Sequence, residues 1–217
     1  MDNRFPDALC DRLLDFDENV RKQVVDAICD VSCHAWGFVS DETTRLIAEH
    51  LRDKSLLVRS YAMERLAEIF RLHCLMCSEA SISSSESNWI PGKILKCFYD
   101  KDIRPETIKV VMFRSLLPTE FSTRDIVKHW IAIFSRFDKV EVKSLEKIME
   151  QKQRLQQEMQ KYMTLRKVYR DTDALEFQKN VLKSFRVMSR WFADPVKAEE
   201  CFKILDQLKD VEKSTRS

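Results

Sequence analysis

The sequence predicts an all-α solenoid, and three observations support this prediction. A motif of Asp, four residues, Val and Arg begins at Asp15 and again 38 residues later at Asp53. Apolar residues follow each copy at three- and four-residue steps, whereas no segment combines period-two alternation with turn signals. A period of about 40 residues with two helices per unit is typical of HEAT-like repeats, whose hairpins must stack to bury a core. We therefore expect a HEAT-like α-solenoid of about five antiparallel helical hairpins.

The repeat extends beyond the motif itself. Asp15 and Asp53 are placed to accept backbone N–H bonds in a turn or at the next helix start, where a carboxylate also meets the positive end of the helix dipole. Arg21 and Arg59 are interpreted as structural ladder residues, because a guanidinium can bond an acid or a carbonyl of the adjacent hairpin. A phosphate contact is the alternative. Five apolar pairs share the same offset: Leu13 with Leu51, Val24 with Ala62, Val25 with Met63, Ile28 with Leu66, and Val31 with Ile69.

Residues 1–77 of a single domain, 1–217, are predicted to form the regular repeats. The third helix is expected to be capped by Ser40 or Asp41 and to place Leu46, Ile47 and Leu51 inward. Gly37 is expected to stop the helix before it. The four helices predicted in this part cover about 6–14, 17–37, 40–51 and 55–75.

The serine-rich stretch 78–88 is predicted to be a loop or flexible insertion. Phosphorylation there is possible in principle, but composition favours a solvated connector. Residues 89–217 are predicted to be irregular repeats, starting with a helix near Pro91. Residues 98–102 are similar to 13–17, but Pro105 stands in the place of the repeat valine, so this third hairpin is degenerate.

A long helix over about 139–170 is the main irregular feature. At 1.5 Å per residue it measures roughly 45 Å, so we expect it to project beyond its neighbours, either as a partner surface or as a brace. Asp194-Pro195 predicts the start of the last helix, to about Val211. The helices on either side of the long one are expected at about 122–137 and 173–192. The first of these helices carries the apolar residues Ile126, Trp130, Ile133 and Phe134. The second is expected to place inward Leu175, Val181, Leu182, Phe185, Met188 and Trp191.

Composition argues against several functional classes. Charged residues make up 33% of the chain, yet the net charge is only +2, which predicts no strong general attraction to nucleic acid or membrane. No stretch approaches the roughly 20 apolar residues of a membrane span, and no apolar signal region follows the first residues, so we expect a soluble, non-secreted chain. Seven scattered cysteines favour a reducing compartment.

Some side chains could bind a metal or act as an acid–base pair, but structural roles are favoured for them. Cysteines and histidines near two helix ends could hold zinc, although packing is the preferred reading because zinc-knuckle turns are missing. Asp125 and His129 lie four residues apart and are interpreted as a surface ion pair. No Walker, dinucleotide or HExxH motif occurs, so neither an enzyme nor a cofactor is expected. The residues considered for zinc are Cys29, Cys33, His34, His73, Cys74 and Cys77.

The long helix also carries basic residues that could form a stripe. Acidic residues interleave with them, which favours ion pairs and a solvated face over an anion or partner site. The basic set is Lys143, Lys147, Lys152, Arg154, Lys161, Arg166, Lys167 and Arg170, and the acidic set is Glu141, Glu146, Glu150 and Glu158.

Four strings of the sequence resemble the middle of the cohesin-associated "precocious dissociation of sisters" family, closest to its plant members. They are LLDFDENVRKQVVDAICDV, LRDKSLLVRSYAMERLAEIF, WIPGKILKCFYDKDIRPETI and LEKIMEQKQRLQQEMQKYMTLRKVY. The resemblance covers essentially the whole chain. Family members are much longer, so this chain corresponds to an internal part, a short paralogue or a truncated gene model.

The resemblance implies a non-enzymatic HEAT-repeat scaffold in the nucleus, associated with chromatin through its partners. Those partners are the kleisin subunit of cohesin and a Wapl-type releasing factor, and the implied role is to maintain or release sister-chromatid cohesion. No membrane or small-molecule substrate is implied, and no kleisin contact is assigned to a particular residue. The alternative is a purely architectural segment that supports binding surfaces elsewhere in a longer protein.

Overall fold

The computed structural model describes residues 9–34, 40–80, 87–117, 119–168, 174–192 and 194–214, and all of the regular structure there is helical. Contacts divide the chain into two compact units, Met1–Leu145 and Glu146–Ser217. The all-α prediction is therefore confirmed for the described residues. The treatment of 1–217 as one solenoid segment stays a prediction.

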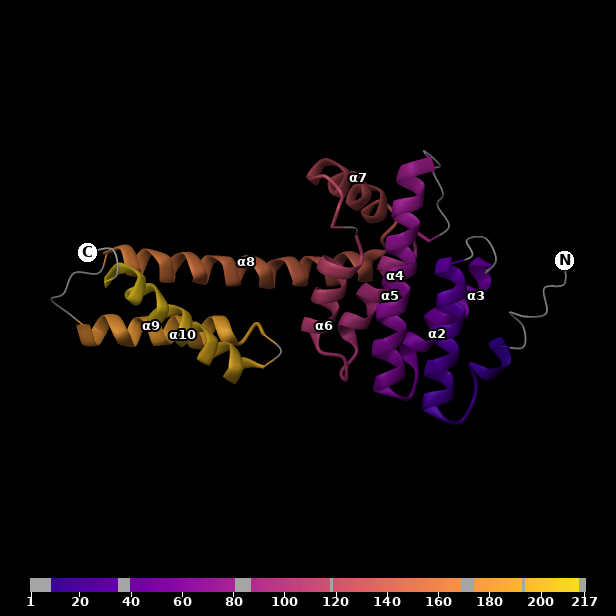
Figure 1. Cartoon of the computed structure of the whole chain (residues 1–217), viewed down its shortest axis with the longest axis horizontal. Helices are drawn as coiled ribbons and strands as arrows, with labels where there is room; N and C mark the ends of the chain where they lie inside the picture. The colour runs from indigo at the N-terminus through magenta and orange to yellow at the C-terminus, as the bar shows by residue number, and fades with distance from the viewer. Residues whose placement is uncertain are drawn as a thin grey trace. The chain divides into compact units, whose positions relative to one another are not determined.

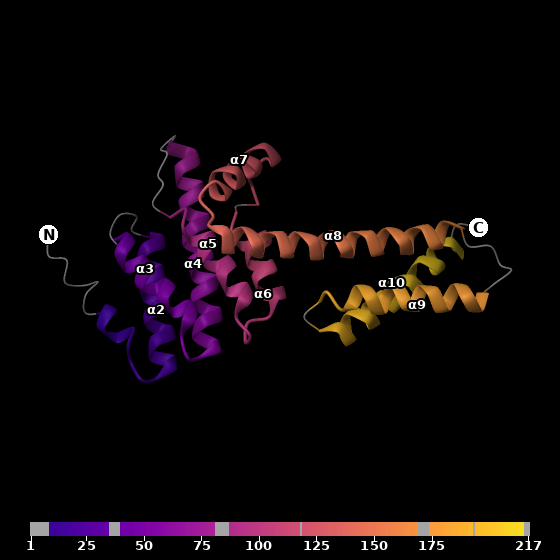
Figure 2. The same cartoon turned by 180° about the vertical axis from the view of Figure 1, so that it is seen from behind.

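The first unit contains seven helices among its described residues, besides the helical residues 9–12 and short 3-10 or π segments. Figures 1 and 2 show the order of these elements along the chain. The helices are α2 (Glu18–His34), α3 (Asp41–Glu49), α4 (Leu56–Ala80), α5 (Ile90–Lys96), α6 (Pro105–Val110), α7 (Thr123–Phe134) and the start of α8 (Lys139–Val168). The short segments are η1 (His50–Arg52), η2 (Cys97–Tyr99) and η3 (Val111–Ser115).

Helix α4 is the centre of this unit. It packs against α2, α3, α5 and the π-helical segment η3, and α2 lies beside it in both views (Figures 1 and 2). Its apolar stripe Met63, Leu66 and Phe70 is fully buried, as is Val25 of α2. Because isolated helices are only marginally stable in water, burial between neighbours supplies most of the stability of these helices.

The repeat predicted from the sequence is present in the packing. Four of the five equivalent apolar pairs are buried at both positions, and in the fifth Val31 is half-buried while Ile69 is buried. The predicted cap of α3 is also confirmed, because the Thr43 N–H donates to Ser40 Oγ at 3.1 Å. The four fully buried pairs are Leu13 with Leu51, Val24 with Ala62, Val25 with Met63, and Ile28 with Leu66.

Two residues predicted to face inward, Leu46 and Leu175, are exposed, and so is Phe134 of the apolar set on α7. In α3 the buried face includes Ile47, and one residue turns a helix by about 100°, which carries Leu46 off that face. In α7 only Ile133 is buried, and the neighbouring Phe134 makes an edge contact with Phe137 at 6.0 Å between ring centroids. Leu175 lies in the first turn of α9, before the buried stripe of that helix begins.

Several helix boundaries differ from the prediction. Helix α4 continues to Ala80, three residues into the stretch expected to be a loop, while 81–86 lie outside the described residues. Gly37, which was predicted to stop a helix, and residue 173, the predicted start of a helix, also fall outside the described residues. Before Pro118 the backbone widens into η3, where the Leu116 N–H donates to the Val111 carbonyl at 3.0 Å, five residues back.

The second unit contains the remainder of α8 with α9 (Ala174–Ser189) and α10 (Pro195–Ser214). Its core is Val181, Phe185 and Met188 of α9. Tyr162 of α8 packs on Phe185 with 5.2 Å between ring centroids, and Phe202 of α10 stacks on the same ring at 5.8 Å. This half of α8 therefore has packed neighbours, and its predicted projection beyond them stays a prediction. No described helix is both long and apolar enough to cross a membrane.

Candidate protein-interaction surfaces

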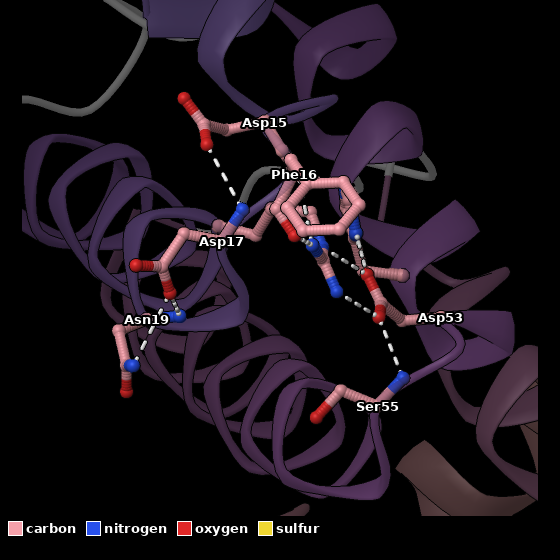
Figure 3. A network of polar contacts seen from close by, with 8 residues as sticks. Asp15, Phe16, Asp17, Asn19, Asp53 and Ser55 are labelled. Atoms are coloured by element: carbon pink, nitrogen blue, oxygen red, sulfur yellow. Dashed lines mark hydrogen bonds and ion pairs between the residues drawn. The ribbon is translucent and has the colours of Figure 1, made fainter.

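Arg21 joins the first two repeats through four hydrogen bonds. Its Nε and Nη2 donate to the two carboxylate oxygens of Asp53 at 2.8 and 2.7 Å, which is a bidentate pair. Its Nη1 donates to the carbonyls of Asp15 and Phe16 at 2.8 and 2.9 Å. Figure 3 shows this cluster, in which Asp15 and Phe16 come from the turn before α2 and Asp53 comes from the turn before α4.

Arg59 repeats this contact one unit further along the chain. Its Nη1 donates to Asp100 at 2.6 Å and its Nη2 donates to Asp102 at 2.9 Å. Each motif arginine therefore binds the motif aspartate of the following repeat, as Arg21 binds Asp53. The interpretation of both arginines as structural ladder residues is confirmed.

The ladder aspartates share one turn geometry. In each turn the carboxylate accepts the backbone N–H two residues later, which fixes the chain before the next helix. Figure 3 shows this bond at Asp15 and at Asp53. The bonds run from Asp17 N–H to Asp15 at 3.0 Å, from Ser55 N–H to Asp53 at 2.8 Å, and from Asp102 N–H to Asp100 at 2.9 Å. The similarity of 98–102 to 13–17 in sequence thus corresponds to a common local structure.

Asp53 is the most strongly held carboxylate of the ladder. Burial opposes its ionisation, but hydrogen bonds from Arg21, from the Ser55 backbone and from His50 outweigh this and hold the pKa of Asp53 well below its ordinary value. The hydrogen bonds to Asp53 raise the pKa of Arg21. Both side chains are therefore charged at neutral pH, and neither is available as a phosphate contact.

The ladder changes at its two ends. Asp15 binds Arg12 of its own turn at 3.1 Å. Glu106 stands six residues after Asp100, where the regular repeats carry arginine, so the third repeat cannot continue the ladder. The regular Arg–Asp contacts therefore span α2 to η2 and the turn after it.

A second polar joint holds α5 to the start of α8 within the first unit. Asp138 caps α8, because its Oδ1 accepts the Glu141 N–H at 3.0 Å, and Glu141 returns a contact by accepting the Asp138 N–H at 2.9 Å. Lys96 of α5 lies 2.6 Å from Asp138 and 3.1 Å from Glu141. Gly92 leaves room for this carboxylate, since a Cβ there would come within 2.6 Å of it.

Beside this joint is a cavity of about 550 Å³, here called the α3–α5 pocket. Asp41 organises its wall by accepting the Trp89 indole N–H at 2.9 Å and the Arg45 Nε–H at 2.7 Å. The Arg45 guanidinium lies 4.7 Å from the centre of the Trp89 ring. Arg136 and Phe137 complete the mixed aromatic and charged lining.

The second unit has a larger groove, of about 980 Å³, between α8 and α9. We call it the α8–α9 groove. Leu165, Val168 and Val187 supply its apolar lining, and Lys161 and Lys183 stand among its polar residues. One wall is fixed where the Ser184 hydroxyl donates to Glu158 at 3.2 Å. Such a groove has the dimensions of a peptide or helix site and has no catalytic group.

The residues considered for zinc do not form a site within the described part of the chain. No group of three metal-ligating side chains occurs there, and the Cys77 side chain lies outside it. Burial raises the pKa of Cys29 to about 12, so its thiol stays protonated at neutral pH. Cys74 and His73 are buried in α4, as the packing interpretation predicted.

Asp125 and His129 have different partners from the expected pair. Asp125 accepts the Ser122 hydroxyl at 2.6 Å and lies 3.6 Å from Lys128. His129 stacks on Phe121 with 5.0 Å between ring centroids, and burial lowers its pKa. The ion pair predicted between Asp125 and His129 is therefore replaced by a capping contact and a ring stack.

Lys161 and Arg154 pair with acidic residues of α8, as the sequence suggested, whereas Arg166 pairs with another helix. Lys161 lies 3.1 Å from Glu158, and Arg166 lies 3.3 Å from Asp206 of α10. Arg154 and Glu150 are 4.0 Å apart. These contacts favour a solvated, ion-paired face on α8. Part of the same helix also lines the concave α8–α9 groove.

Comparison with known proteins places these features in a family. The family model described as "Sister chromatid cohesion protein PDS5 protein" matches residues 2–213. The chain is 58% identical over 203 residues to "Sister chromatid cohesion protein PDS5 homolog A" of Arabidopsis thaliana, which covers 94% of this chain and 13% of that protein. It is 24% identical over 204 residues to "Sister chromatid cohesion protein PDS5 homolog B" of Gallus gallus, with 94% and 14% covered.

A solved structure supports the fold. The structure described as "Structure of the Pds5-Scc1 complex and implications for cohesin function" matches with a TM-score of 0.76 at 17% sequence identity, over 94% of this chain and 32% of that chain. The predicted helical solenoid is thus confirmed. This chain spans only a small part of the length of these relatives, and the Arg–Asp ladder and both concave surfaces lie within the matched span. On the agreement of family model, relatives and fold, the chain belongs to the PDS5 family of sister chromatid cohesion proteins.

Proposed function

We propose that this chain is a non-enzymatic scaffold segment that binds the kleisin subunit of cohesin and helps to maintain or release sister-chromatid cohesion. The observation that carries the proposal is the family match over residues 2–213, which includes every helix described above apart from the last residue of α10. The relative solved in complex with Scc1 supports the choice of a kleisin as the partner. A nuclear, chromatin-associated location and cooperation with a Wapl-type releasing factor belong to the same proposal.

The structure is suited to this role in a physical sense. Charge-paired contacts at Arg21 and Arg59 hold successive hairpins in a fixed register, so the surfaces between hairpins are preorganised. The α3–α5 pocket and the α8–α9 groove are concave surfaces that an extended or helical peptide could occupy. Binding to a preorganised surface loses less conformational entropy than binding to a mobile one.

The experiment is a pull-down with the whole chain as bait and fragments covering the N-terminal, central and C-terminal parts of a plant kleisin. Circular dichroism first establishes that the bait is helical. We expect one fragment to be retained at physiological salt. If a folded bait retains none of them, the chain has no autonomous kleisin binding, and the purely architectural role becomes the better description.

A further inference from the structure

We propose that the α8–α9 groove binds an acidic amphipathic helix of the partner, with its apolar face on the groove and its acidic flank on Lys183. This proposal rests on the proposed function, because it takes the helix to be a segment of the kleisin. It goes further by naming the surface and the chemistry of the segment. Each element of the argument lies within the second unit.

The apolar part of the groove is what an amphipathic helix needs. Val168 of α8 is 71% exposed, and it lies with Leu165 and Val187 on the groove side of the two helices. The lining of α8 runs from Gln157 to Val168, which is about three helical turns or roughly 17 Å. A partner helix of that length presents apolar anchors at positions i, i+4 and i+7.

The charge of the groove selects an acidic partner. Glu158 and Lys161 form an ion pair and Ser184 also bonds Glu158, so the pair together offers little net charge to a ligand. Lys183 is exposed and forms no ion pair with a described residue. The unit as a whole is basic, with sixteen Lys and Arg against twelve Asp and Glu in 146–217, although the whole chain is nearly neutral. This asymmetry favours acidic ligands at this unit and speeds their association.

A helix fits the groove better than an extended strand. All regular structure in the described part of this unit is helical, so it presents no sheet edge to pair with an extended backbone. A helix satisfies its own backbone groups and needs only side-chain contacts from the groove. A fourth helix beside α8, α9 and α10 would bury apolar surface in the way that helical bundles do.

The test measures binding of the whole chain to overlapping peptides, each of roughly three to six helical turns, that together span the kleisin of Arabidopsis thaliana. Fluorescence anisotropy gives the affinities, and circular dichroism reports helix formation in the bound peptide. Two groove variants, Lys183→Glu and Val168→Asp, are compared with two matched controls outside the groove, Lys197→Glu and Val196→Asp. Val196 is 70% exposed, so the two valine substitutions start from the same exposure.

We expect an acidic, helix-forming peptide to bind the native chain. Each groove variant should weaken this binding at least tenfold, whereas the controls change it less than about twofold. The Lys183→Glu effect should shrink at high salt, and the Val168→Asp effect should persist.

Three results would overturn the inference. If the peptide binds all four variants equally well, the kleisin uses another surface and the proposed function survives without this site. If neither whole kleisin fragments nor peptides bind the native chain, the proposed function and this inference fall together. If duplex DNA binds as tightly as the best peptide and only Lys183→Glu weakens DNA binding, the groove is part of a polyanion-binding patch. Binding that depends on the lysine but not on Val168 is typical of contacts with phosphate.

Discussion

Replacing Arg21 by methionine should destabilise the first unit more than any other single change in the ladder. The arginine side chain is 4% exposed and that of Asp53 is 5% exposed, so the substitution leaves a buried carboxylate without its main partner. Breaking a buried pair in this way costs roughly 3–5 kcal/mol. Asp53 keeps its contacts with the Ser55 N–H and His50, which places the expected loss near the lower limit, at about 3 kcal/mol.

Arg59 and Arg12 provide matched comparisons for the same substitution. Arg59→Met should cost only about 1–2 kcal/mol, because Asp102, one of its partners, is 66% exposed and water can solvate it. Arg12→Met removes a solvent-exposed pair with Asp15 and should cost less than about 0.5 kcal/mol.

The assay is urea unfolding monitored by hydrogen-exchange mass spectrometry. Peptides from α2 and α4 report on the unfolding of the first unit separately from that of the second. The predicted order of destabilisation is Arg21, then Arg59, then Arg12. A loss below about 1 kcal/mol for Arg21→Met, or a loss equal to that of Arg12→Met, would refute the argument that the buried ladder contact holds the repeats in register.

The remaining predictions concern the contact between Gly92 and Glu141, the Asp53 carboxylate and the cysteine thiols. Gly92→Ala should lower the free energy of unfolding by about 1–3 kcal/mol, because its Cβ meets the Glu141 carboxylate. The double mutant with Glu141→Ala should lose clearly less stability than the sum of the losses in the two single mutants. A purely additive double mutant would contradict this contact. The depressed pKa of Asp53 means that its stabilisation is present above about pH 4 and is lost as the pH falls further, so Asp53→Asn should be less stable at pH 7 and lose less stability on acidification. Parallel pH curves for the two proteins would rule this out. A thiol reagent should modify exposed Cys201 at least about 100-fold faster than buried Cys29, whose pKa is about 12, and comparable rates by peptide mass spectrometry would show that α2 opens readily.

The Arg–Asp ladder could be predicted from the sequence because both of its ends recur with the same spacing. A fixed offset between Asp15 and Arg21 places the arginine on the same side of each hairpin, and stacking then brings it to the next turn. The turn at Asp100 was also recognisable, since its residue types match the earlier copies. Local periodicity is sufficient for contacts that repeat along a solenoid.

The orientation of individual apolar residues was less predictable. In α3, Ile47 is buried and Leu46 is exposed although both are large aliphatic residues, because the helix rotates by about 100° between them. In α9, Leu175 precedes the point at which neighbouring helices cover the stripe. Composition gives the number of apolar residues, but tertiary packing decides which of them are covered.

Contacts between distant residues carried little sequence signal. The spacing of Asp138 and Glu141 matches a capping box, so the start of α8 could have been recognised more fully. The approach of that carboxylate to Gly92 joins residues 49 positions apart, and nothing local indicates it. The α8–α9 groove is likewise a product of how two helices pack, and each helix alone reads as a solvated amphipathic segment.

The most direct test of the central claim is calorimetric titration of whole kleisin fragments into the folded native chain. We expect saturable binding of one fragment with a negative heat-capacity change, because apolar surface is buried on a preorganised helical scaffold. Lys183→Glu should weaken this binding, whereas Lys197→Glu should not. A folded chain that gives no heat of binding at several temperatures with any fragment would contradict the claim that this part of the family binds a kleisin by itself.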